Sequence, residues 1–87
     1  DIQLIAYPNP AQDIFTVKFS VATDEQVTGA IYDVTGRMVH SIINAKADGG
    51  RLYEWQINST NFRSGSYVIM MNVGDEIVHE KMMINGK

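Results

Sequence analysis

The chain has 87 residues and a formal net charge of −3 at pH 7, from seven Lys and Arg against ten Asp and Glu. A chain of this length holds one hydrophobic core, so a multidomain protein is excluded. Hydrophobic residues make up 45% of the sequence, which is typical of a folded domain. An acidic chain lacks the clustered cations that neutralise phosphates, and we expect no nucleic-acid partner.

Two absences narrow the possible chemistry. The chain contains no cysteine, which excludes disulfides, thiolate metal sites and a cysteine nucleophile. Its apolar stretches, such as residues 67–71, are far shorter than the roughly 20 residues that cross a bilayer, so we expect no membrane-spanning segment. The chain starts at Asp1 and shows no export-signal pattern there, and we expect residues 1–87 to be a single domain cut from a larger protein.

The first half of the chain reads as short strands separated by turns. A strand at residues 4–7 ends where Pro8 and Pro10 follow, because proline cannot donate to a β-ladder. Residues 15–21 alternate apolar and polar side chains with the period of two that a half-buried strand requires. A β-rich run at residues 27–34 leads into the next turn.

A hairpin follows that run. Residues 33–37 form its turn, in which Gly36 supplies the positive φ that tight hairpin loops need, and residues 38–43 form the returning strand. Residues 44–50 are the longest polar break of the chain. Alternation resumes at residues 52–57, which predicts one more strand.

The last third of the chain predicts a polar connection and a second hairpin. In the connection, residues 58–66, we expect Phe62 to point inward over the end of the core. Residues 67–73 and 77–84 flank Gly74-Asp75, which is suited to a two-residue hairpin turn. We expect the final strand to lie at a sheet edge, where unpaired backbone groups are either masked or available to a partner strand.

About seven short antiparallel strands predict an all-β fold, an immunoglobulin-like β-sandwich, with a small barrel as the alternative. We expect Trp55 to fill the middle of the core and Tyr67 to tie a sandwich corner to the backbone. Four of the five methionines are expected to face one another across the last hairpin, as adaptable core filler or as a surface that accepts a partner. These are Met70, Met71, Met82 and Met83.

No pattern of catalytic or metal-binding residues stands out. His40 and His79 lie in separate predicted strands without the spaced partners of a zinc site. Acidic pairs at residues 24–25 and 75–76 lack the spaced ligands of a calcium loop. Serine, histidine and aspartate residues are present, but no local sequence signature indicates that they form a catalytic triad. We therefore expect a protein that is not an enzyme, with no catalytic residues, no cofactor and no metal.

Four landmarks follow one another along the chain: Pro8-Asn9-Pro10, then Asp33 with Gly36-Arg37, then Gly65 with Tyr67-Val68, and last a basic and apolar tail that begins at Lys81. Their ordered set resembles the C-terminal sorting domains of the type IX (Por) secretion system, type A. The resemblance covers nearly the whole chain. The residues that match the family motifs are Pro8, Asn9, Pro10, Asp33, Gly36, Arg37, Gly65, Tyr67 and Val68, and those of the basic and apolar tail, which the secretion apparatus is expected to recognise, are Lys81, Met82, Met83, Ile84 and Lys87.

The resemblance implies a non-catalytic sorting signal at the C-terminus of an exported protein, covalently linked to an N-terminal cargo domain. Such a domain folds in the periplasm, is recognised by the type IX secretion apparatus at the outer membrane, and is commonly removed by a sortase-like cysteine peptidase that attaches the cargo to surface lipopolysaccharide. The cargo then lies on the outer membrane surface or outside the cell. We expect recognition to use residues 67–87, by backbone pairing or methionine contacts and with lysines giving orientation.

Two other functions remain open from the residues alone. A fibronectin-like or carbohydrate-binding module of an extracellular enzyme would need an exposed aromatic row, for which the candidates are Tyr7, Tyr32, Tyr53 and Trp55. A self-associating domain would pair or swap its edge strands. Export of a fused reporter distinguishes the sorting function from both.

Overall fold

A computed structural model of the chain describes residues 1–85. Those residues contain seven β-strands and no helix, which confirms the predicted all-β class. The strands are β1 (Ile2–Tyr7), β2 (Ile14–Val21), β3 (Glu25–Tyr32), β4 (Met38–Ala47), β5 (Leu52–Asn58), β6 (Gly65–Val73) and β7 (Glu76–Ile84). No helix that could cross a membrane occurs in this part of the chain.

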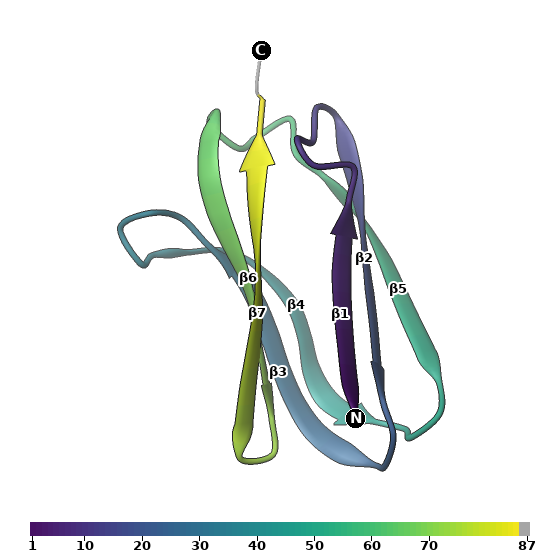
Figure 1. The fold of residues 1–87 in the computed structure, drawn as a ribbon. Helices are drawn as coiled ribbons and strands as arrows, with labels where there is room; N and C mark the ends of the chain where they lie inside the picture. The colour runs from purple at the N-terminus through teal and green to yellow at the C-terminus, as the bar shows by residue number, and fades with distance from the viewer. Residues whose placement is uncertain (86–87) are drawn as a thin grey trace.

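The strands form two sheets that pack face to face (Figure 1). One sheet has the order β1-β2-β5 and the other has the order β4-β3-β6-β7, with every pair antiparallel. This arrangement confirms the predicted immunoglobulin-like sandwich rather than a small barrel. Strand β7 is an edge strand, as the sequence predicted. Figure 1 shows the N-terminus and the end of β7 at opposite ends of the sandwich.

The core lies between the sheets and follows from the alternation of side chains along the strands. Phe15, Phe19 and Ile31 are fully buried, and β2 and β6 alternate buried with partly exposed residues along nearly their whole length. Gly29 leaves the space that the sulfur of Met71 occupies, because a β-carbon at residue 29 would overlap that side chain. The Gly74-Asp75 turn connects β6 and β7 as predicted, with Gly74 at a φ of 57°.

We expected a polar break at residues 44–50, but in the structure the break begins only after residue 47. Strand β4 continues to Ala47 and stays paired with β3. The side chains of residues 44–46 are exposed, because β4 is an edge strand and needs no apolar residues there. The predicted run at residues 27–34 is displaced in the other direction: β3 begins at Glu25 and ends at Tyr32, two residues earlier than expected at each end.

Trp55 does not fill the middle of the core. It is half-buried at the border of the core and stacks on Tyr53, with 6.0 Å between the ring centroids. The physical reason is that β5 is the edge strand of the three-stranded sheet, so a large ring on it covers the side of the core. Phe15 and Phe19 on the central strand β2 occupy the middle instead.

The methionines do not face one another across the last hairpin. The two-residue turn places Val73 opposite Glu76, and this register sets Met82 opposite Tyr67. Met71 and Met82 point into the core, whereas Met83 is exposed on the outer face. The expected methionine cluster is therefore divided between the two faces of the sheet.

Candidate functional site

Two adjoining depressions lie where the β3–β4 hairpin, the β5–β6 connection and the end of β7 meet. The larger, about 570 Å³, lies between the hairpin and the connection, and we call it the arginine groove. The smaller, about 440 Å³, lies along the end of β7, and we call it the tail groove. The two share Asp33, Val34, Ser66 and Tyr67 in their linings, so they form one continuous surface.

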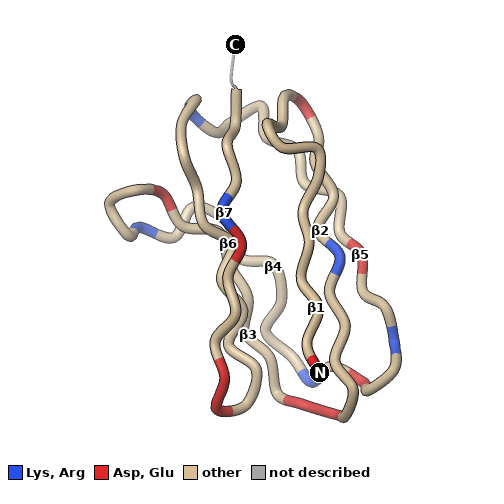
Figure 2. The backbone as a smooth tube through the Cα atoms, viewed as in Figure 1, with Lys and Arg blue, Asp and Glu red and all other residues tan. Residues whose placement is uncertain are grey.

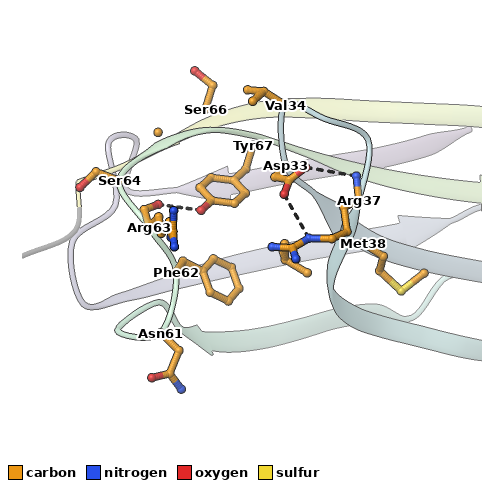
Figure 3. A pocket seen from close by; sticks show the side chains of 12 residues that line it. Asp33, Val34, Arg37, Met38, Asn61, Phe62, Arg63, Ser64, Ser66 and Tyr67 are labelled. Carbon is orange, nitrogen blue, oxygen red and sulfur yellow. Dashed lines mark hydrogen bonds and ion pairs between the residues drawn. The ribbon is translucent and has the colours of Figure 1, made fainter.

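Asp33 organises the hairpin wall of this surface (Figure 3). Its Oδ1 accepts hydrogen bonds from the Thr35 hydroxyl at 2.6 Å, the Thr35 amide at 2.9 Å and the Arg37 amide at 3.1 Å. Its Oδ2 lies 3.4 Å from Arg37 Nε. The Thr35 hydroxyl, with the two amides and the Arg37 charge, lowers the pKa of Asp33. Gly36 has a φ of 86°, as the turn requires.

Tyr67 holds the opposite wall. Its hydroxyl donates to the Arg63 carbonyl at 2.6 Å, which confirms the predicted tie between a sandwich corner and the backbone. Its ring lies against Phe62, with 5.5 Å between the centroids. Phe62 is half-buried and packs on the core, in agreement with its expected inward orientation. The connection is thereby fixed at the mouth of the arginine groove.

Ser59 anchors the other end of the connection, and sequence reasoning missed it. It is fully buried, its hydroxyl donates to the Gln12 carbonyl at 2.6 Å, and its amide donates to the Asp13 carbonyl at 2.8 Å. A serine in a polar loop carries no sequence signal that separates a buried anchor from a solvated side chain. The loop pairing that makes it an anchor exists only in the folded chain.

The Pro8-Asn9-Pro10 motif lies beside the outer edge of β7. The Asn9 side chain accepts a hydrogen bond from the Met83 amide at 2.9 Å and donates to the Lys81 carbonyl at 3.4 Å. The Ala11 amide donates to the Met83 carbonyl, and the Asn85 amide donates to the Ala11 carbonyl, both at 2.8 Å. The last part of this edge is therefore already satisfied by the chain itself, and a partner strand could pair there only by displacing these groups.

The predicted tail residues divide between core and surface. Met82 is 3% exposed and Ile84 is fully buried, so neither side chain is available to a partner of the folded domain. Lys81 and Met83 are exposed and line the tail groove. Lys87 lies outside the described residues. Recognition by the secretion apparatus stays a prediction for all five.

The remaining motif residues lie around the same surface. Pro8 and Pro10 are exposed on either side of Asn9. Gly65 begins β6 and lines the arginine groove, and Val68 lines the tail groove. Motif residues that are far apart in the sequence are thus brought together at one surface, whereas the sequence alone placed them only in order.

The other candidates do not form a comparable site. His40 lies on β4 near Phe62, with 6.3 Å between the rings, and His79 lies on β7. No group of three His, Asp or Glu side chains that could hold a metal ion occurs within residues 1–85. Of the predicted aromatic row, only Tyr7 is exposed, because Tyr53 and Trp55 pack against the core and Tyr32 is also half-buried.

Comparisons with curated proteins and with solved structures gave no match. A family model described as "Secretion system C-terminal sorting domain" matches residues 5–85, a range that contains every motif residue of the two grooves. Domains of this family act as sorting signals and not as catalysts. The chain therefore belongs to the C-terminal sorting domains of the type IX secretion system.

Proposed function

We propose that this domain directs a cargo, joined to its N-terminal side, across the outer membrane through the type IX secretion apparatus, and that a sortase-like cysteine peptidase removes it when the cargo is attached to the surface. The observation that carries the proposal is the family match over residues 5–85 together with the gathering of the family motifs around two adjoining grooves. In this proposal, the folded domain meets the secretion apparatus in the periplasm.

The positions of the N-terminus and of the end of β7 are compatible with this proposal. The N-terminus lies at the end of the sandwich opposite the C-terminal end of β7 (Figure 1). A cargo attached before Asp1 therefore leaves the two grooves accessible to the apparatus. Strand β1 begins at Ile2, so a cut before Asp1 falls outside the strands and releases the domain without breaking its fold.

The contact surface that we propose is narrower than the whole C-terminal hairpin. Since Met82 and Ile84 are core residues, the folded tail presents Lys81 and Met83 to a partner. Both line the tail groove beside Asn9. We propose that Met83 supplies apolar contact and that Lys81 orients the partner by its charge.

The test is the export of a reporter fused before residue 1. Deleting residues 81–87 removes two core side chains, so it cannot separate misfolding from lost recognition. The sharper pair is Met83→Ser, at 43% exposure, against Ile77→Ser, at 61% exposure on the same strand and outside both grooves. We expect Met83→Ser to lower surface reporter while Ile77→Ser leaves it unchanged, with equal melting temperatures for both domains.

Two results would count against the proposal. If a reporter without the domain reached the surface equally well, the domain would not be a sorting signal. If Met83→Ser and Lys81→Gln combined left export at the level of the unmodified domain, the tail groove would not be the contact surface.

A further inference from the structure

The arginine groove carries two guanidinium groups on either side of an aromatic floor. Figure 3 shows the side chains of Arg37 and Arg63 flanking the rings of Tyr67 and Phe62. The Arg37 side chain is 78% exposed even though its Nε contacts Asp33. Arg63 is exposed, and no ion pair of its side chain occurs among residues 1–85. Its carbonyl, not its side chain, anchors the tyrosine corner.

Positive charge in this groove is only partly cancelled by the groove's own lining. The charged residues of its lining are Arg37, Arg63 and Asp33, which leaves one net positive charge in a domain whose net charge is −3. Both carboxylate oxygens of Asp33 are engaged within its own turn. Figure 2 shows the acidic residues of the β2–β3 and β6–β7 turns at the far end of the sandwich. An anion that reaches the groove therefore meets a lining with one net positive charge, and the acidic side chain of Asp13, outside that lining, lines a neighbouring depression with Arg63.

We propose that the arginine groove binds an extended acidic segment of a partner protein, with one carboxylate held between the guanidinium groups of Arg37 and Arg63. Guanidinium groups bind carboxylates through two parallel hydrogen bonds, and Arg37 keeps both Nη groups for this purpose because its contact with Asp33 uses Nε. The apolar neighbours of the acidic residue pack on the ring of Phe62. The inference rests on the proposed sorting function only for the identity of the partner.

The shape of the surface favours a peptide over a small anion. The groove holds about 570 Å³ and continues into the tail groove through the shared residues Ser66 and Tyr67. A chain that leaves the arginine groove along this path next meets Lys81 and Met83, so one extended segment reaches both regions. Two arginines beside an aspartate do not form the run of cations that a polyphosphate or nucleic acid requires.

The walls are also fixed before any ligand arrives. The Asp33 hydrogen bonds set the hairpin wall, and the tyrosine corner and the buried Ser59 set the opposite wall. Binding to a preformed groove avoids the cost of ordering two loops, so a short segment is sufficient.

The test uses the 87-residue domain and a short end-blocked peptide with a central glutamate between phenylalanine and valine. Its twin carries glutamine in place of glutamate, and inorganic phosphate is titrated separately. Backbone and arginine side-chain NMR signals report binding and its place on the domain. We expect saturable shifts at Arg37 and Arg63 with the glutamate peptide, weakened by added salt, and no saturable shifts with the glutamine twin.

Single variants locate the site. Arg63→Gln keeps the backbone carbonyl that Tyr67 uses and should weaken the glutamate peptide by about tenfold, the effect of losing one charged hydrogen-bonded pair. Arg51→Gln is the matched control, because that arginine is exposed, already contacts an aspartate and lies outside both grooves. It should leave the affinity unchanged.

The outcomes separate this inference from the sorting function. Equal binding of the glutamine twin, equal losses from Arg63→Gln and Arg51→Gln, or saturation by phosphate but not by the peptide would each overturn the acidic-segment proposal. None of these results would change the conclusion about the sorting function, because that function is tested separately by export of the reporter. Conversely, if Arg63→Gln abolished peptide binding but left reporter export unchanged, the groove's ligand would act outside the export step.

Discussion

Met82 and Met83 are neighbours in the chain, yet the structure gives them opposite roles. Met82 is 3% exposed and packs in the core cluster opposite Tyr67, whereas Met83 is 43% exposed on the outer face. Met82→Ala removes buried atoms and leaves a cavity, which costs about 2 to 5 kcal/mol. Met83→Ala changes a partly exposed surface and should stay within roughly 0.5 kcal/mol.

These costs are large for a domain of this size. At about 0.05 to 0.15 kcal/mol per residue, the whole domain has roughly 4 to 13 kcal/mol of stability, so Met82→Ala removes a substantial part of it. Each kcal/mol corresponds to a fall in Tm of about 4 to 8 °C in a domain of this length. Urea unfolding followed by Trp55 fluorescence measures the difference, because the half-buried indole becomes exposed when the sandwich opens.

The comparison between the two variants is the decisive result. The slope of the free energy of unfolding against urea must match for both proteins, so that the midpoints compare the same transition. Equal midpoints for Met82→Ala and Met83→Ala would refute the register of β7 and with it the division of the tail into core and surface residues. A larger loss for Met83→Ala would show that the two faces are reversed.

Three further changes test other parts of the fold. Tyr67→Phe keeps the ring but removes the hydrogen bond to the Arg63 carbonyl, and it should lower the free energy of unfolding by about 1 kcal/mol in the same urea assay. Gly49→Ala places a β-carbon 2.6 Å from the backbone of Thr23, and the resulting shift should cost roughly 1 to 3 kcal/mol; an unchanged midpoint would contradict the close approach. Since the folded state lowers the pKa of Asp33 from its ordinary value of 3.8, its charge stabilises the fold above that pH and loses this effect as the pH falls through the lowered pKa; the stability difference between the unmodified domain and Asp33→Asn should shrink on acidification, and a constant difference would contradict it.

The sequence predicted the elements that depend on local chemistry. Alternation at residues 15–21 identified β2, glycine identified the turns at Gly36 and Gly74, and the position of Tyr67 after a polar connection identified the corner. In each case the signal lies in a few adjacent residues. The family motifs were recognisable for the same reason, because each is a short local pattern.

Features that depend on neighbours distant in the sequence were missed or misplaced. The continuation of β4 to Ala47 follows from pairing with β3, and the border position of Trp55 follows from the strand order. Ser59 became an anchor only because two loops meet. Asn9 was known as a motif residue, but its hydrogen bonds to the end of β7 could not be read from a pattern more than seventy residues away.

Because side chains alternate between the two faces of β7, only some residues of its tail motif can contact a partner of the folded domain. Of the four residues Lys81, Met82, Met83 and Ile84, two point into the core, so a folded domain shows at most two of their side chains to another protein. Two side chains on one strand carry little specificity. Under the proposed contact at the tail groove, further selectivity would come from the surface that adjoins it, which is the arginine groove. Motifs from four parts of the chain meet around these grooves, so the surface that we propose as the contact is assembled by the fold and not by the tail alone.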